Sequence, residues 1–272
     1  MYHTFIEAFE DYAGNMKMDR QAFERRMLDK LQIDWNLSAG AFSGDKMVGF
    51  ITQTLNQYNG KRTVYNGGTG VIPAYRGHDL TGHMYRALLP EMIKHNADQV
   101  ILEAIVDNQW AIDAYEKVGF ERNRRLKCFK RVKEADKSIS DDFTDLKVVD
   151  FDSSIVQSYS EDLSTSFMDT LDQLYKGRTS QKMILSVDDK GQLIGYLVFD
   201  PSNARVARAW VSVGKRRQGI GRKLVNYAAQ LSDNKPLSIL NIDDQATVAH
   251  QFLIACGFEN QIHQWEMTLE IK

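Results

Sequence analysis

The stretch with the clearest chemistry is basic and rich in glycine, and it runs from Val211 to Lys223. A β-branched run ends there, glycines flank Ile220, and an apolar-periodic segment follows from Leu224 to Leu231. Glycine lets the backbone approach a ligand closely, and a helix that begins at such a turn points unpaired N–H groups and its positive dipole end at an anion. These residues predict a strand, an anion-binding turn and a helix.

Two common phosphate-binding motifs do not fit this stretch. A Walker loop needs lysine after its last glycine, but Ile220 follows Gly219. A dinucleotide-binding fingerprint needs a third small residue where Leu224 stands. The stretch is therefore neither a Walker loop nor a dinucleotide-binding fingerprint.

Length and composition indicate a soluble globular protein with two domains of ordinary size. The chain has 272 residues, of which 43% are hydrophobic and 26% charged. A net charge of −2 gives no bulk attraction to nucleic acid or membrane, so we expect neither as a partner. Two cysteines and an acidic N-terminus without a long apolar run favour a reducing, cytoplasmic location.

The elements around such turns can be traced through the first half of the chain. Asp19 is a suitable N-cap for the second helix, and Gly119 is well placed to end the last one. Periodicity and turn residues predict helices over about 5–13 and 19–31, a hairpin over 38–52, a strand over 63–71, a turn over 73–81 with a helix to about 92, a strand over 100–106 and a helix over 111–118.

The glycines and arginine that mark turns in the first half recur in the same order in the second half, which predicts two copies of one fold. The separation drifts slightly, as loops of different length require. The matched positions are Gly49 and Gly195, 146 residues apart, Arg76 and Arg216, 140 apart, and Gly119 and Gly257, 138 apart.

The polar segment between the copies predicts the domain boundaries. We expect a first domain over residues 1–132, a linker over 133–143 and a second domain over 144–272. The basic run Arg122 to Lys133 could bind nucleic acid, but Leu126 and Cys128 alternate with charged neighbours as in a half-exposed strand. We interpret this run as a strand.

The turn Arg216 to Gly221 resembles the [QR]-x-x-G-x-[GA] signature of the GCN5-related N-acetyltransferase (GNAT) family, whose loop holds the pyrophosphate of acetyl-coenzyme A. The element order of each copy is similar to that family over nearly the whole chain. The resemblance implies an α/β (α+β) fold with two tandem domains, each a mixed, mostly antiparallel twisted sheet flanked by helices, with splayed central strands. Ala8 to Tyr12 and Gln264 to Met267 add a less specific likeness to tandem acetyltransferases.

The resemblance also implies two coenzyme-binding loops. In the first, Asp79 and Thr81 replace the expected small residues, so we expect weakened binding there, because Asp79 repels a pyrophosphate unless its side chain points outward. The expected coenzyme contacts are Val71, Arg76, Gly77, His78, Asp79, Leu80, Thr81, Asn108 and Ala111 in the first copy, and Val211, Val213, Arg216, Arg217, Gln218, Gly219, Ile220 and Gly221 in the second.

The stretch Leu102 to Phe120 resembles the ribosomal-protein N-terminal acetyltransferases of this family. By that resemblance Glu103 is the general base, acting through water, Tyr115 is the general acid near the sulfur, and Asn108 contacts the pantetheine arm. A phenol with a pKa of about 10 can protonate a departing thiolate. The alternatives are a strand Glu103 paired with a cation and a Tyr115 that is simply a core aromatic.

The second copy lacks these groups. An offset of 138 places Asn241, Ala246 and Leu253 opposite Glu103, Asn108 and Tyr115, respectively. Leu253 cannot donate a proton and Asn241 cannot usefully accept one. The copy with the better coenzyme loop is therefore the one without a visible acid and base.

These observations predict an N-acetyltransferase that moves an acetyl group from acetyl-CoA to a primary amine, with the chemistry in the first copy. A non-catalytic sensor of CoA or acyl-CoA, and catalysis in the second copy, remain alternatives. The acceptor stays open as a small-molecule or peptide amine, and the protein as a monomeric pseudo-dimer or a homodimer. His78 and His83 are expected to face solvent, and no metal site is expected.

Overall fold

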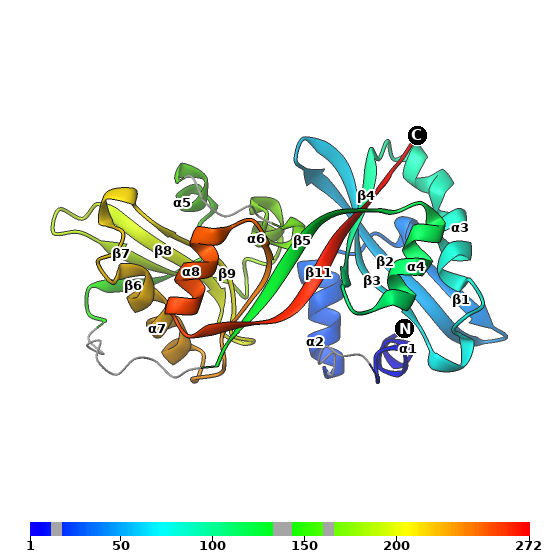
Figure 1. Cartoon of the computed structure of the whole chain (residues 1–272), viewed down its shortest axis with the longest axis horizontal. Coiled ribbons are helices and arrows are strands. Elements are labelled where there is room, and N and C mark those ends of the chain that lie inside the picture. Colours follow the sequence, from blue (N-terminus) through cyan, green and yellow to red (C-terminus); the bar gives the residue numbers. More distant parts are fainter. Residues whose placement is uncertain (12–17, 133–142, 160–165) are drawn as a thin grey trace. The chain divides into compact units, whose positions relative to one another are not determined.

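The computed structural model describes residues 1–11, 18–132, 143–159 and 166–272 (Figure 1). It divides into two compact units, unit 1 formed by Met1–Arg124 with Trp265–Lys272 and unit 2 formed by Arg125–Gln264. The division differs from the predicted boundaries because the last eight residues of the chain belong to unit 1. The predicted linker lies, except for Phe143, outside the described residues.

Unit 1 is built mainly from the first half of the chain. Its strands follow the order β1-β2-β3-β4-β11-β5, in which the last two also contribute residues to unit 2. Its elements are α1 (Tyr2–Ala8), α2 (Arg20–Glu24), η1 (Arg25–Lys30), η2 (Trp35–Leu37), β1 (Ala39–Ser43), β2 (Lys46–Tyr58), β3 (Lys61–Val71), η3 (Pro73–Tyr75), α3 (Leu80–Lys94), β4 (Gln99–Ile105), α4 (Gln109–Val118) and the start of β5 (Glu121–Arg131).

Unit 2 repeats this series of elements. Its strand order is β11-β5-β10-β9-β8-β7-β6. Its elements are β6 (Leu146–Asp150), α5 (Ser153–Ser158), η4 (Phe167–Asp169), α6 (Leu171–Lys176), β7 (Lys182–Val187), β8 (Leu193–Asp200), β9 (Arg205–Val211), η5 (Val213–Lys215), α7 (Ile220–Leu231), β10 (Ser238–Asp243), α8 (Thr247–Ala255) and the start of β11 (Phe258–Glu270).

The N-terminal helices begin and end differently from the prediction. The first helix ends at Ala8, and the rest of its predicted span beyond residue 11 lies outside the described residues. The Asp19 cap is confirmed, since its carboxylate accepts a hydrogen bond from the Ala22 N–H at 2.7 Å. The predicted continuous helix changes at Arg25 into a π-helical segment that ends at Lys30.

Strand register confirms the internal repeat. Gly49 on β2 lies opposite Val71 on β3, and Gly195 on β8 lies opposite Val211 on β9. The pairing of β2 with β3 shifts after Thr52, and that of β8 with β9 shifts after Val198, so each long hairpin carries an irregularity at a corresponding place.

The central strands of each unit separate, as the prediction required. In unit 1 the parallel pairing of β3 with β4 joins Thr63–Tyr65 to Gln99–Ile101, although both strands continue well beyond it. In unit 2, β9 and β10 pair, within the described residues, through Arg205 and Ser238 alone. Each unit therefore holds a wedge between its two central parallel strands.

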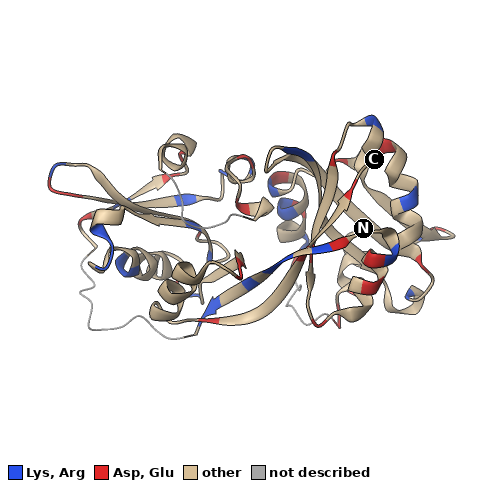
Figure 2. Cartoon of the chain, turned by 45° about the horizontal axis from the view of Figure 1, so that its top comes forward, with Lys and Arg blue, Asp and Glu red and all other residues tan. Residues whose placement is uncertain are grey.

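One face of each sheet is covered by the two helices that follow the central strands. In unit 1, buried residues of α3 and α4 pack with Leu102 and Ala104 of β4. In unit 2, α7 and α8 pack on Ile239 and Ile242 of β10 in the same way. The basic run 122–131 forms most of β5, which confirms the strand interpretation. Figure 2 shows positive and negative residues interspersed along the ribbons of both units.

Candidate active site

The turn before each long wedge helix has the same backbone in both units. In unit 1 the left-handed residues are Gly77 (φ 83°) and Asp79 (φ 52°), and in unit 2 they are Arg217 (φ 63°) and Gly219 (φ 87°). Asp79 and Gly219 are the N-caps of α3 and α7, and neither provides a side-chain hydrogen bond to its helix. The first-turn N–H groups of both helices therefore lack a side-chain cap and suit an anion.

The arginine that opens each turn is tied to the preceding strand. Arg76 donates from Nε to the Val71 carbonyl at 3.2 Å, and Arg216 donates to the Val211 carbonyl at 3.0 Å. Arg76 is also held by both oxygens of Asp11, at 2.6 and 2.8 Å. The hydrogen bond from Arg76 lowers the pKa of the Asp11 carboxyl below its usual value. In unit 1 the turn arginine thus already has an anionic partner.

Asp79 lies where an anionic ligand of the first turn would come. A Cβ at Gly82 would meet the Asp79 carboxylate at 2.5 Å, so this carboxylate lies against the first turn of α3. Arg86 donates to it at 2.9 Å and lowers its pKa. The first loop therefore carries a carboxylate at its helix N-cap, where the second loop has Gly219.

The glycines of the second turn differ in what surrounds them. A Cβ at Gly214 or Gly219 would meet nothing within 4 Å, so the turn is open on that side. A Cβ at Gly221 would meet the Phe252 ring at 2.8 Å and Val211 at 3.6 Å. Gly221 is therefore required for packing of α7 on α8, whereas Gly219 supplies the left-handed cap.

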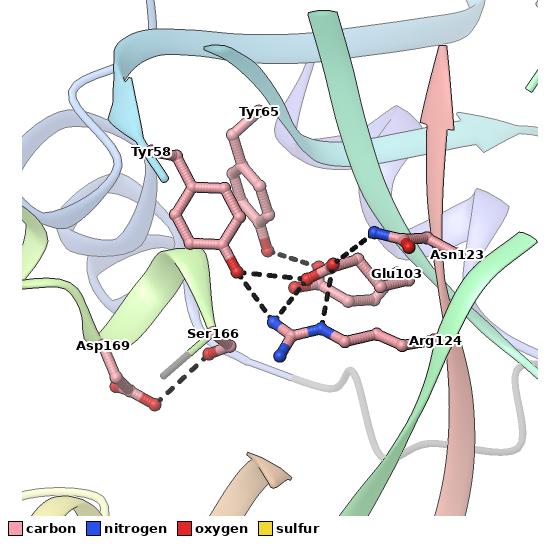
Figure 3. A network of polar contacts seen from close by, with 8 residues as sticks. Tyr58, Tyr65, Glu103, Asn123, Arg124, Ser166 and Asp169 are labelled. Carbon is pink, nitrogen blue, oxygen red and sulfur yellow. Dashed lines mark hydrogen bonds and ion pairs between the residues drawn. The ribbon is translucent and has the colours of Figure 1, made fainter. Parts of the chain in front are cut away.

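Glu103 is held by a tyrosine of the neighbouring strand. Tyr65 on β3 donates from its hydroxyl to the Glu103 carboxylate at 2.7 Å, and Tyr65 itself is buried (Figure 3). A hydrogen bond from a phenol stabilises the ionised carboxylate and fixes its orientation. Sequence reasoning missed Tyr65, because an aromatic residue in a strand is more often part of the core.

Tyr115 lies in an aromatic group between α3, α4 and β5. The Tyr115 ring packs edge-on against the Phe120 ring, with 5.6 Å between their centroids. The Tyr85 ring packs on Phe120 in the same way, with 5.2 Å between the centroids. Asn66 donates to the Tyr85 hydroxyl at 2.7 Å, and burial, with a smaller effect of Tyr115, raises the pKa of Tyr85 well above its usual value. Tyr115 is 9% exposed and packs as a core aromatic, so its hydroxyl is the group that can do chemistry.

The two candidate catalytic side chains lie on opposite faces of the sheet. Leu102 and Ala104 pack in the same core cluster as Tyr115. Side chains alternate along a strand, so Glu103, which lies between them, points to the other face.

Asn108 acts as a helix cap. It is the N-cap of α4, and its side-chain oxygen accepts a hydrogen bond from the Ala111 N–H at 3.2 Å. Its amide nitrogen remains as a donor for a ligand. His78 and His83 are exposed, as expected, and the ring of His78 contacts the backbone carbonyls of Tyr75 and Arg76 in its own turn.

A second carboxylate lies in the Glu103 region and comes from the end of the chain. Glu266 on β11 is 2% exposed and pairs with Arg124 on β5 at 2.9 Å, while Tyr58 on β2 contacts both partners (Figure 3). The only sequence signal for it was the likeness of residues 264–267 to other tandem chains. Asp11 had a similar signal in residues 8–12.

The corresponding positions of unit 2 have a different chemistry. Leu253 is 3% exposed and belongs to the core. Asn241 has a left-handed backbone (φ 59°), lies where the pairing of β10 with β5 shifts, and accepts a hydrogen bond from Cys128. Ala246 is the N-cap of α8 and offers no side-chain cap.

A cavity of about 890 Å³ lies in unit 1 beside α3 and the end of α4. Its lining includes Gly82, Tyr85 and Arg86 from α3 and Lys117 from α4. Among the described residues, no cluster of three or more histidine, cysteine, aspartate or glutamate side chains could hold a metal ion. Within the same residues, no helix is both long and apolar enough to cross a bilayer.

With this geometry the chain can be compared with known proteins. Residues 2–120 match the acetyltransferase (GNAT) family, and residues 140–267 match the acetyltransferase (GNAT) domain. The chain therefore belongs to the GNAT family and carries two GNAT domains in tandem. This family uses acetyl-CoA as its acyl donor.

Similar curated proteins match over about a third of the chain. A mycothiol acetyltransferase of Corynebacterium aurimucosum is 35% identical over 89 residues, which are 32% of this chain and 28% of that protein. An N-alpha-acetyltransferase 30 of Schizosaccharomyces pombe is 29% identical over 87 residues, 32% of this chain and 58% of that protein. The chain thus spans less than two thirds of the length of either relative.

Solved structures agree over the whole chain in fold. A putative acetyltransferase from Pyrococcus horikoshii has a TM-score of 0.70 at 17% identity, covering 99% of this chain and 84% of that one. A tandem GNAT protein from the clavulanic acid biosynthesis pathway has a TM-score of 0.69 at 15% identity, covering 99% and 94%. At such identities the likeness concerns the fold alone.

Proposed function

We propose that unit 1 is an N-acetyltransferase domain that transfers an acetyl group from acetyl-CoA to a primary amine. The observation that carries this proposal is the placement of Glu103 and Tyr115 on opposite faces of the sheet beside the wedge. An amine can then be deprotonated on one face while a thiolate leaves on the other. Unit 2 has neither group at the corresponding positions.

The reaction divides between the two side chains. The amine nitrogen attacks the thioester carbonyl, a C–N bond forms, and the C–S bond breaks. The proton lost by the amine passes, through water, to the Glu103 carboxylate, which Tyr65 orients. The Tyr115 hydroxyl gives its proton to the departing sulfur. Each proton transfer of this kind typically contributes 10²–10⁴-fold to the rate.

The donor would be held by backbone groups at the start of α3. The turn that ends at Asp79 leaves the first-turn N–H groups without a side-chain cap, which fits a pyrophosphate. The Asn108 amide and the separation of β3 from β4 would accommodate the pantetheine arm. Asp79 weakens this site but leaves its backbone donors in place.

The acceptor class follows from the relatives and the charge of the site. One relative is named for acetylation of mycothiol and the other for acetylation of N-terminal α-amines, so a small-molecule or peptide amine is proposed here. The Glu103 carboxylate and the Tyr65 hydroxyl suit an amine, which approaches as a cation, loses one proton to bulk water before attack and gives its second proton to Glu103 as the C–N bond forms.

The decisive test compares variants at corresponding positions of the two units. Thiol release from acetyl-CoA is measured with a panel of amines and N-terminal peptides. We expect Tyr115→Phe and Glu103→Gln each to lower kcat about 10²-fold or more. Leu253→Met, a volume-conserving change at the Tyr115 counterpart, should leave kcat unchanged. Full turnover in the Tyr115→Phe, Glu103→Gln double variant would refute the assignment.

A second role, coenzyme binding without turnover, is favoured for unit 2 by Gly219 and the matching loop signature. Calorimetry with coenzyme A distinguishes one site per chain from two. A bound coenzyme at about 100 times its dissociation constant should stabilise its unit by about 2.7 kcal/mol. Binding in unit 2 with no loss of turnover when that site is disabled would support a sensing or structural role.

A further inference from the structure

The last strand of the chain brings a buried carboxylate into unit 1. Arg124 donates to Glu266 from Nε at 3.0 Å and from Nη2 at 2.9 Å, one bond to each carboxylate oxygen. Asn123 donates to the same carboxylate at 3.2 Å and Tyr58 at 3.3 Å. The group is therefore a fork-like, charge-assisted pair whose remaining acceptor positions are filled by neighbours (Figure 3).

Stability alone is a weak reason for such a pair. A buried ion pair loses hydration that its mutual attraction often fails to recover, and an apolar pair of similar volume is commonly as stable. The same strand offers a contrast, because Glu270 pairs with Lys61 at 2.8 Å with both side chains about half exposed. In the buried pair the Arg124 and Glu266 side chains are 19% and 3% exposed.

The pair lies within electrostatic reach of the proposed general base. Tyr58 receives a hydrogen bond from Arg124 at 2.7 Å. Burial raises the pKa of the Tyr58 phenol, and the carboxylates of Glu266 and Glu103 raise it further, against an opposing effect of Arg124. Figure 3 shows Glu103 close to Arg124, with Tyr58 and Tyr65 next to each other and their hydroxyls directed toward this network.

We propose that Glu266, with Arg124 and Tyr58, is a positioning group that balances the charge around Glu103 and so completes the unit 1 site from the end of the chain. This inference rests on the proposed role of Glu103 as the base. Arg124 and Glu266 neutralise each other, so that the group adds no net charge to that of the Glu103 carboxylate. The cationic amine then meets a negative site.

Several groups face Glu103 from the surrounding elements, and they define the expected signs. They are Tyr58 on β2, Tyr65 on β3, Arg124 on β5 and Glu266 on β11. Loss of the Glu266 charge makes the surroundings of Glu103 more positive, so we expect the pKa of Glu103 to fall. Loss of the Arg124 charge makes these surroundings more negative, so we expect this pKa to rise.

The test is the pH profile of kcat/KM for the full chain. The acid limb is the fall of kcat/KM at low pH. The part of it that Glu103 causes is identified by its absence in the residual activity of Glu103→Gln. We expect Glu266→Gln to move this limb to lower pH and Arg124→Met to move it to higher pH, each by roughly one unit. The double variant removes both charges and should return the limb to near its original position.

Two matched variants and one folding control complete the design. Glu270→Gln and Lys61→Met each remove one partner of the exposed pair between β11 and β3. Both variants should leave the acid limb at its original pH. If Glu266→Gln fails to fold, the limb of Arg124→Met must still lie above that of the double variant. Shifts in the same direction for both single variants, or no shift at all, would overturn the inference. Full activity of Glu103→Gln would instead overturn the proposed function.

Discussion

The two units share the wedge between their central strands but differ in the residues around it. Unit 1 has the candidate catalytic side chains, and unit 2 has the more suitable coenzyme-binding turn. Unit 1 has Glu103 and Tyr115 beside its wedge but a turn arginine paired with Asp11 and a carboxylate, Asp79, at the helix start. Unit 2 has an open turn capped by Gly219 but a leucine, Leu253, in place of the phenol. Both units have separated central strands, so the chemical difference between the two wedges lies in a few side chains.

Corresponding residues of the central strands show the same divergence. Tyr65 on β3 and Arg205 on β9 both begin the wedge, 140 residues apart. Tyr65 turns to Glu103, a carboxylate on the neighbouring strand. Arg205 instead forms a buried pair with Asp169 of η4 at 2.7 Å. In unit 1 the Tyr65 hydroxyl therefore contacts the candidate general base. In unit 2 the Arg205 side chain instead connects β9 to η4.

The largest effect is expected from removal of residues 265–272. Unit 1 would lose Met267, a fully buried core residue, and the Glu266 partner of Arg124. Loss of a buried methionine costs about 2–5 kcal/mol and an uncompensated buried charge about 3–5 kcal/mol. Their sum approaches the whole stability of an ordinary domain. We expect unit 1 to unfold, as measured by amide hydrogen exchange, while unit 2 keeps its protection.

The control for this deletion is removal of Lys272 alone, an exposed terminal residue. That variant should retain the exchange protection of both units. Equal loss of protection in both units after removal of residues 265–272 would contradict the assignment of these residues to unit 1.

A reciprocal exchange at the helix caps should reverse the order of the two coenzyme sites. Gly219→Asp places a carboxylate at the start of α7, and Asp79→Gly removes one from the start of α3. We expect the first change to weaken coenzyme A binding in unit 2 about tenfold or more, or ~1.4 kcal/mol, and the second to tighten binding in unit 1. Isothermal calorimetry with coenzyme A measures both.

Backbone strain must be separated from charge in this exchange. Asparagine tolerates a left-handed backbone and carries no charge, so Gly219→Asn is the matched control. It should cost less affinity than Gly219→Asp. Equal losses would show that the backbone conformation, and not the carboxylate, decides binding at the cap.

Local features of the fold could be predicted from the sequence because they depend on neighbours in the chain. The Asp19 cap and the turn that ends at Gly219 follow from residue types at short spacing, whereas the separated central strands were expected from the family resemblance. The pairing of Arg124 with Glu266 could not be predicted, since 142 residues separate them and no periodicity links the two. The contribution of residues 265–272 to unit 1 could not be predicted for the same reason, because β11 contributes to both units.

Functional residues divided in the same way. Glu103 and Tyr115 were predicted from one continuous stretch, and their roles stay predictions. Tyr65, Tyr85 and Tyr58 were not identified, because a buried tyrosine in a strand or helix has the same sequence signal as a core aromatic. Only the three-dimensional structure shows which phenols meet a carboxylate or an amide.

A smaller effect is expected from Asp11→Asn. The Asp11–Arg76 pair is exposed on both sides, so we expect a change in unfolding free energy within about 1 kcal/mol. The pKa of Asp11 is lowered by Arg76, so the pair stabilises above the ordinary carboxyl pKa and this contribution is lost as the pH falls through the lowered value. Thermal melts should therefore differ from wild type above about pH 4 and converge below it.

The same variant frees the turn arginine for an anion, so coenzyme binding in unit 1 should tighten a few-fold. Glu7→Gln removes another exposed pair of the N-terminal segment, with Lys46, and should leave binding unchanged. If both variants alter binding alike, the effect belongs to the general charge of the segment and not to Arg76.

We expect no change at all in the reactivity of the two cysteines. Their protection from a thiol reagent independently reports whether unit 2 stays folded. Both thiols of the chain, Cys128 and Cys256, are buried and belong to unit 2. Burial raises the pKa of Cys256 to about 11, so at pH 8 its thiolate fraction is small as well as inaccessible. We expect neither thiol to react with a disulfide reagent in the native protein or in Glu266→Gln, and both to react on full unfolding. Reaction of either thiol in Glu266→Gln would mean that loss of this carboxylate opens unit 2, and the two units would then share one stability.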